Sequence, residues 1–68
     1  MVNYEPHVSK TARYTIDETS NLLGIHRHTL RRYTKQGKIC YSRRHADDRK
    51  FYFGKEILRF WRATSINF

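Results

Sequence analysis

The sequence has little of what ties a chain together covalently or holds it in a membrane. Its single cysteine, Cys40, excludes an internal disulfide framework and fits a reducing compartment, so we expect a cytoplasmic protein. It has no run of ~18 apolar residues that could span a membrane, and residues 1–10 lack the apolar region of a secretion signal. A chain of 68 residues is one small domain, too short for a Rossmann sheet or a two-domain active site.

Patterns for catalysis and for metal binding are missing as well. No serine or cysteine has a base at motif spacing, and no pair of carboxylates lies in apolar sequence, so we expect no enzyme activity. His26 and His28 are two positions apart, which places them on different faces of a helix, and no CxxC or HxxxH spacing occurs. We therefore expect no metal and no other cofactor.

Acidic residues are scarce, and the basic ones are concentrated in one segment. Asp and Glu number 6 against 14 Lys and Arg, which gives a net charge of +8. Positions 26 to 50 hold most of the basic residues: Arg27, Arg31, Arg32, Lys35, Lys38, Arg43, Arg44, Arg49 and Lys50. This charge indicates a polyanionic partner, most often nucleic acid. A charged membrane surface would need a strongly amphipathic basic helix, and we expect no membrane contact.

The first structured segment is a short helix with clear signals at both ends. Thr15 and Glu18 have the spacing of a capping box, which predicts a helix over 16–23. Apolar residues follow at helical spacing, and Gly24 is typical of the residue that ends a helix.

A second helix is predicted over 27–36, starting at or just after His26 and ending before Gly37. Histidine is a weaker N-cap than Ser or Asp. Leu30 and Tyr33 form the apolar stripe of this helix, and basic residues surround it. Two short helices joined by a turn that contains glycine are typical of a helix-turn-helix.

After Gly37 the pattern changes to that of strands. Branched and aromatic residues predict strands near 38–42 and 49–53, and the polar connector between them predicts a hairpin with a basic tip, or wing. A third helix is expected over 55–64. The fold class is therefore α+β, a small winged helix-turn-helix in the order helix-helix-β-hairpin-helix.

The ends of the chain are predicted to be less regular than its middle. Residues 1–12 show no helical or strand period and contain Pro6, so we expect a mobile N-terminal arm. The winged helix-turn-helix occupies residues 13–64, and residues 65–68 form a C-terminal tail.

Six segments carry a family resemblance over about residues 13–62. They are Tyr14-Thr15-Ile16-Asp17-Glu18, Leu22-Leu23-Gly24-Ile25, Thr29-Leu30-Arg31-Arg32-Tyr33, Gly37-Lys38-Ile39, Arg49-Lys50-Phe51-Tyr52 and Glu56-Ile57-Leu58-Arg59-Phe60-Trp61. In this order they resemble the MerR-like winged-helix superfamily, and within it the excisionase-type DNA-binding proteins. His26 stands where that subgroup usually has Ser, and the wing arginine of the superfamily aligns with Lys50 or Phe51.

The resemblance implies sequence-selective binding to double-stranded DNA. It implies an excisionase-like architectural factor that bends DNA and helps a tyrosine recombinase, or integrase, to excise a mobile element. The alternative is a small MerR-like transcriptional regulator, or the DNA-binding domain of a larger one. An RNA-binding protein or a protein-interaction module are further alternatives. We expect a monomer in solution that assembles cooperatively on adjacent DNA sites.

The expected contact residues come from the second helix and from the wing. Residues near the start of a recognition helix usually reach base edges, which here are Arg27, His28 and Arg31. The expected phosphate contacts are Arg32, Lys35 and the hydroxyl of Tyr33. The expected wing contacts are Arg43, Arg44, Arg49 and Lys50.

Six further aromatic residues, all after Gly37, are expected in the core. They are Tyr41, Phe51, Tyr52, Phe53, Phe60 and Trp61. A base-stacking platform is the alternative, but a two-stranded hairpin needs such packing to be stable. Cys40 is expected to be a small packing residue in a strand, and Asp47 and Asp48 to pair with Arg43 or Arg44.

Overall fold

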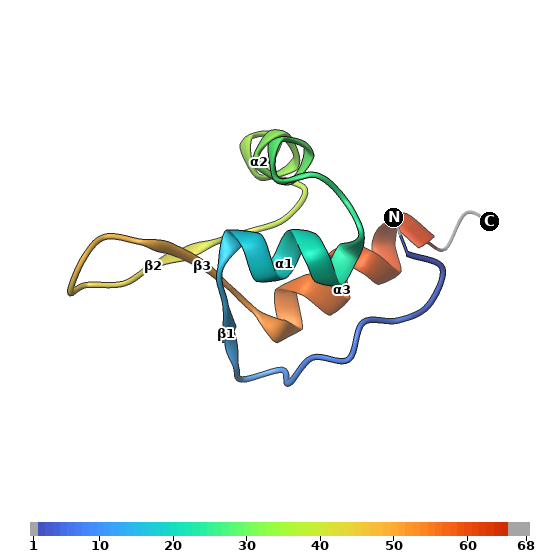
Figure 1. Ribbon diagram of the computed structural model, residues 1–68, viewed down its shortest axis with the longest axis horizontal. Coiled ribbons are helices and arrows are strands. Elements are labelled where there is room, and N and C mark those ends of the chain that lie inside the picture. Colours follow the sequence, from blue (N-terminus) through green and yellow to red (C-terminus); the bar gives the residue numbers. More distant parts are fainter. Residues whose placement is uncertain (1, 66–68) are drawn as a thin grey trace.

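Three helices and three short strands make up the described part of the chain, residues 2–65 of this computed structural model (Figure 1). Their order is β1 (Arg13–Tyr14), α1 (Ile16–Leu23), α2 (Arg27–Lys35), β2 (Ser42–Arg43), β3 (Lys50–Phe53) and α3 (Gly54–Ser65). The predicted α+β winged helix-turn-helix is therefore confirmed. No helix within residues 2–65 is long and apolar enough to cross a membrane.

Helix α1 begins and ends where its local signals predict. Thr15 Oγ1 accepts from the Glu18 amide at 3.1 Å, and Glu18 Oε1 accepts from the Thr15 amide at 3.0 Å, so both hydrogen bonds of the capping box form. Gly24 follows the helix with φ +69°, a conformation that glycine adopts without strain. A Cβ at Gly24 would also come within 2.7 Å of Val2 Cγ1.

Helix α2 is capped by a histidine. His26 Nδ1 accepts from the His28 amide at 3.2 Å, and the two imidazole rings stack with centroids 4.8 Å apart. The prediction that these side chains lie on different faces of a helix was wrong. His26 lies before the helix in extended backbone (φ −72°, ψ 146°), so its ring folds back over the first turn.

The predicted strand at 38–42 was wrong in its extent, because only Ser42 of that range lies in β2. The Lys38 amide donates to the Tyr33 carbonyl at 3.0 Å, and the Cys40 amide donates to Glu56 Oε1 at 3.3 Å. These amides are therefore unavailable to a sheet. Cys40 is also exposed instead of packed within a strand.

The sheet has the strand order β1-β3-β2, and both pairings are antiparallel. Strand β1, which was not predicted, pairs Arg13 with Phe53 and Tyr14 with Tyr52. Beyond β2, the Asp48 amide donates to the Arg44 carbonyl at 2.8 Å, and Asp48 adopts φ +57°. The hairpin therefore closes in a tight turn and extends to one end of the molecule (Figure 1).

The core joins side chains from α1, α2, β3, α3 and the segment after α2. The fully buried members are Leu23, Leu30, Ile39, Tyr52, Ile57 and Phe60. Most of the aromatic residues expected there are at least half-buried: Phe51 is buried, and Phe53 and Trp61 are half-buried. Tyr41 is the exception, since 36% of its surface is exposed.

The N-terminal segment lies along α3 and meets the end of α1, where the Val2 amide donates to the Leu23 carbonyl at 2.9 Å (Figure 1). The Ala12 and Lys10 carbonyls accept from the Gly54 and Lys55 amides at 3.0 and 3.2 Å, and so satisfy the first amides of α3. A Cβ on Gly54 would overlap the Ser9 carbonyl. The start of α3 is therefore built around residues 9–12, part of the segment that we expected to be a mobile arm.

The same segment is also tied to the last turns of α3. The Val2 carbonyl accepts from Trp61 Nε1 at 3.2 Å, and Glu5 pairs with Arg62 at 2.8 Å. Pro6 is buried. Helix α3 ends at Ser65, and the rest of the predicted 65–68 tail lies outside the described residues.

Candidate nucleic-acid interface

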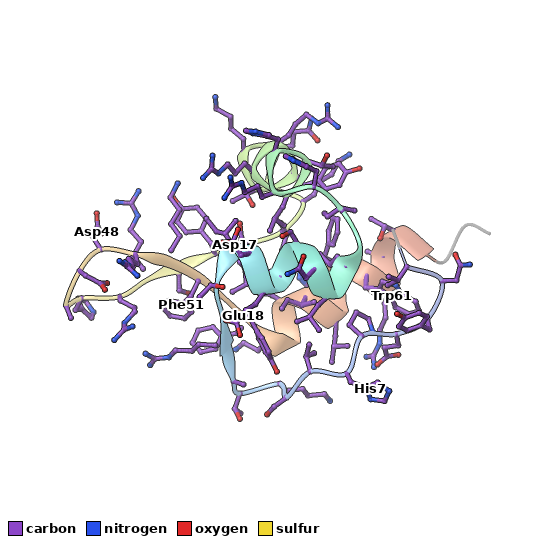
Figure 2. All side chains as sticks on the ribbon, in the orientation of Figure 1. His7, Asp17, Glu18, Asp48, Phe51 and Trp61 are labelled. Carbon is purple, nitrogen blue, oxygen red and sulfur yellow. The ribbon has the colours of Figure 1, made fainter. Side chains whose placement is uncertain are left out.

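Helix α2 has one buried residue and an otherwise polar surface. Leu30 is fully buried and holds the helix on the core. The residues turned to solvent are Arg27, His28, Arg31, Arg32 and Lys35. In Figure 2, nitrogen-tipped side chains radiate from the side of α2 that faces away from α1. Four of these five exposed residues carry a fixed positive charge, so α2 presents a cationic helix face.

A groove of about 1030 Å³ separates α2 from the hairpin. Its cations are Arg27 and Arg31 from α2, Arg13 from β1, and Arg44, Arg49 and Lys50 from the hairpin. Tyr14, Thr15, Ile16, Phe51 and Asp17 complete the lining. With six cations and one carboxylate in its lining, this groove has a strongly positive net charge, which favours an extended anion as ligand.

Three arginines in or near the groove form ion pairs with exposed carboxylates. Arg27 Nη1 lies 3.5 Å from Asp17 Oδ1, with side chains 56% and 72% exposed. At the hairpin tip, Asp48 pairs with Arg43 at 3.2 Å and Asp47 pairs with Arg49 at 3.7 Å. Such exposed pairs contribute little to stability, so these arginines can exchange a carboxylate for a phosphate at low cost.

A second hollow, of about 480 Å³, adjoins the first and shares Ile16, Arg31 and Lys50 with it. Its other lining residues are Thr34, Lys35, Tyr41 and Tyr52. At its floor, the Tyr52 hydroxyl lies 2.7 Å from Thr34 Oγ1. Burial raises the pKa of Tyr52, and the hydrogen bond with Thr34 partly offsets this rise.

The structure brings some of the predicted contact residues together and separates others. Arg27, Arg31, Arg44, Arg49 and Lys50 share the large groove, and Lys35 joins Arg31 and Lys50 in the smaller hollow. The other predicted residues, namely His28, Arg32, Tyr33 and Arg43, line neither.

The half-buried ring of Tyr33 ties one end of α2 to the core. It packs on Phe60 with centroids 5.4 Å apart, and the charges of Arg32 and Lys38 lie 5.9 and 5.1 Å from its centre. His28 instead stacks on His26 at the other end of α2. Within residues 2–65, no three His, Cys, Asp or Glu side chains form a group that could hold a metal ion.

Two residues of this surface were missed in the sequence. Arg13 lies in β1, and its guanidinium carbon is 5.0 Å from the centre of the Phe51 ring. Tyr41 was expected in the core but lines the smaller hollow. Position 13 precedes the capping box, and a two-residue strand is too short to show a period. For Tyr41, the available sequence signal was its position just before the basic pair Arg43 and Arg44.

Comparison with known families agrees with this geometry. The family of the helix-turn-helix domain matches residues 13–65, a range that contains every helix and strand of the described chain. Neither the curated proteins nor the solved structures yield a match. Helix-turn-helix domains bind double-stranded DNA through the second helix of the motif, which here is α2. The chain belongs to the helix-turn-helix domain family of DNA-binding proteins.

Proposed function

We propose that this protein binds specific sites on duplex DNA as an excisionase-like architectural factor in site-specific recombination. The proposed mode of DNA binding rests on the cationic groove between α2 and the hairpin. The major groove is about 12 Å wide and admits one α-helix. With α2 in the major groove, the hairpin lies over the neighbouring backbone and minor groove.

Base reading is assigned to the start of α2. Arg27 and Arg31 are exposed and lie one helical turn apart in the large groove, and His28 lies beside them. An arginine can donate two hydrogen bonds to guanine O6 and N7. Arg32, Lys35 and the Tyr33 hydroxyl are assigned to phosphates, and Arg43, Arg44, Arg49 and Lys50 to the DNA under the hairpin.

The architectural role is supported by the likeness of the six segments to excisionase-type proteins. A single module of this kind buries about 600–1,000 Å² on DNA, which limits its affinity for one site. Adjacent copies raise the effective concentration of the next copy without new base contacts. We therefore propose a monomer in solution that loads cooperatively on repeated sites and bends them, with a tyrosine recombinase as its protein partner.

The test is a footprint on the DNA that flanks the protein's own coding region, followed by gel shifts on one, two and three tandem sites. We expect protection of repeated sites, cooperative loading and a bend in circular-permutation assays. Excision by the partner tyrosine recombinase should depend on the protein. Protection of a promoter without cooperativity or bending would instead establish a transcriptional regulator. Tighter binding to structured RNA than to duplex DNA at equal salt would overturn the proposal.

A further inference from the structure

The smaller hollow offers donors in addition to Arg31, which is assigned to base reading. It lies between the second half of α2 and the base of the hairpin, and its charged residues are Arg31, Lys35 and Lys50. No carboxylate is among its lining residues. The hollow is therefore cationic and has room for a phosphate group.

Two of the three hydroxyl groups in the hollow already use their hydrogens. Thr34 Oγ1 donates to the Leu30 carbonyl at 2.9 Å, because a carbonyl can only accept. The 2.7 Å contact between Thr34 Oγ1 and the Tyr52 hydroxyl must then be donated by Tyr52. Neither hydroxyl has a hydrogen left for a ligand.

The third hydroxyl group in the hollow, that of Tyr41, still has a hydrogen to donate. Its interaction with the Arg43 guanidinium, followed by the charge of Lys50, holds the pKa of Tyr41 below its ordinary value. Lys50 Nζ lies 5.0 Å from the ring centre and the Arg43 guanidinium carbon 5.8 Å. Guanidinium and ammonium groups only donate, so neither Arg43 nor Lys50 can accept the phenol hydrogen, which stays available for another acceptor.

We propose that this hollow holds one backbone phosphodiester of the bound DNA, with Tyr41 donating to a phosphate oxygen and Lys35 and Lys50 supplying the opposing charge. This inference rests on the proposed DNA binding and adds a site to it. The hollow joins α2 to the hairpin, so a phosphate there fixes the position of the helix in the major groove relative to the wing. Tyr41 is then a positioning contact and not a core residue.

The test combines Tyr41→Phe with DNA in which single phosphates are replaced by uncharged methylphosphonates. Tyr41→Phe keeps the ring and removes only the hydroxyl, so the melting temperature should stay the same. Loss of one hydrogen bond to a charged group should weaken duplex binding about tenfold. Tyr4→Phe, which changes a tyrosine with 67% of its surface exposed in the N-terminal segment, is the matched control and should bind like the wild type.

The phosphate scan identifies the contact itself. One methylphosphonate position should weaken wild-type binding, and that penalty should shrink in Tyr41→Phe while the penalties at other positions stay unchanged. If all penalties are the same in both proteins, the phosphate site is wrong although DNA binding stands. If the wild type does not prefer duplex DNA at all, the proposed function fails, and this site fails with it.

A pH series gives an independent measurement. As pH rises through the lowered pKa of Tyr41, the phenol loses its hydrogen and gains a charge that repels phosphate. The groups around it are Arg43, Lys50 and Asp48 in the hairpin and Arg31 and Lys35 across the hollow. The wild-type advantage over Tyr41→Phe should therefore disappear at alkaline pH. A constant ratio of the two affinities would overturn the assignment.

Discussion

The start of the recognition helix depends on one imidazole ring. His26 Nδ1 accepts from the His28 amide, so His26→Ala leaves that amide without a protein partner. We expect a loss of about 1 kcal/mol in the free energy of unfolding, measured by urea denaturation at neutral pH. His26→Ser supplies a hydroxyl acceptor and should restore the stability. His28→Ala removes only the stacked ring and should cost less than His26→Ala; the opposite order would show that stacking and not capping stabilises this end of α2.

Thr19 is a polar residue that is buried inside the protein. It is fully buried in α1, and its Oγ1 has no hydrogen-bond partner among the described residues. Thr19→Val replaces the hydroxyl by a methyl group of similar size and removes the cost of burying an unpaired polar atom. We expect the free energy of unfolding to rise by about 1 kcal/mol. Thr19→Ser, which keeps the hydroxyl and loses the methyl group, should lower it; an equal loss in both variants would mean that the hydroxyl has a partner in solution.

Glu56 links α3 to the segment between α2 and β2. Its Oε1 accepts from the Cys40 amide and from Arg59 Nη2, at 3.3 and 2.8 Å, and Arg59 also donates to the Lys38 carbonyl at 3.5 Å. The hydrogen bonds from Arg59 hold the pKa of Glu56 below its ordinary value, against the opposing effect of burial. A carboxyl with a lowered pKa stabilises the fold above its unfolded-state pKa, and this contribution is lost as pH falls through the lower folded-state value.

Glu56→Gln should therefore lower the free energy of unfolding at neutral pH by less than about 1 kcal/mol. It should also make this free energy fall less steeply as the pH is lowered. The measurement is the denaturant midpoint between pH 7 and pH 3. Arg59→Gln should have a similar effect, and the double variant should be no worse than the sum of the two. If the denaturant midpoint of Glu56→Gln falls as steeply between pH 7 and pH 3 as that of the wild type, this carboxyl does not have the proposed role.

The hairpin tip should matter for binding and little for folding. Replacing Arg43 and Arg44 by Ser should leave the melting temperature nearly unchanged, because exposed charges contribute little to stability, and should weaken DNA binding tenfold or more. Asp48→Asn tests the opposite change in charge, because it removes a negative charge beside Arg43. Asn also tolerates the φ of +57° at this position. This variant should tighten binding at low salt. A marked fall in the melting temperature of the double Ser variant would show that these arginines are structural.

Elements set by local signals could be predicted from the sequence, and elements set by distant partners could not. The capping box at Thr15 and the glycine at 24 determine α1 within a few residues of chain, and its predicted bounds are confirmed. Strand β1 exists only because Arg13 and Tyr14 meet Phe53 and Tyr52, about 40 positions away. The short β2 has a similar cause, because Glu56 in α3 takes the Cys40 amide that a longer strand would need.

In the candidate site, too, local features could be predicted from the sequence and features set by distant partners could not. The cations of α2 and the hairpin could be found from the sequence, since they fall within one segment, positions 27 to 50. Their gathering around one groove, together with Arg13 from β1, depends on how the sheet places the hairpin beside α2. Tyr41 was assigned to the core because a two-stranded hairpin needs aromatic packing to be stable, whereas its position before the short β2 leaves it exposed between Arg43 and Lys50.

The asymmetry of charge over the molecule determines how binding should respond to salt. If α2 and the hairpin together neutralise five to eight phosphates, log K against log salt concentration should have a slope of about −4 to −7. Lys50→Gln removes a cation that lines both hollows and should make the slope less steep by about one. Lys55→Gln changes an exposed lysine in α3 that lines neither and should leave the slope unchanged. Fluorescence anisotropy on one labelled duplex measures all three proteins. A slope near zero would contradict phosphate neutralisation, and an equal change in both variants would mean that DNA contacts α3 as well as the groove.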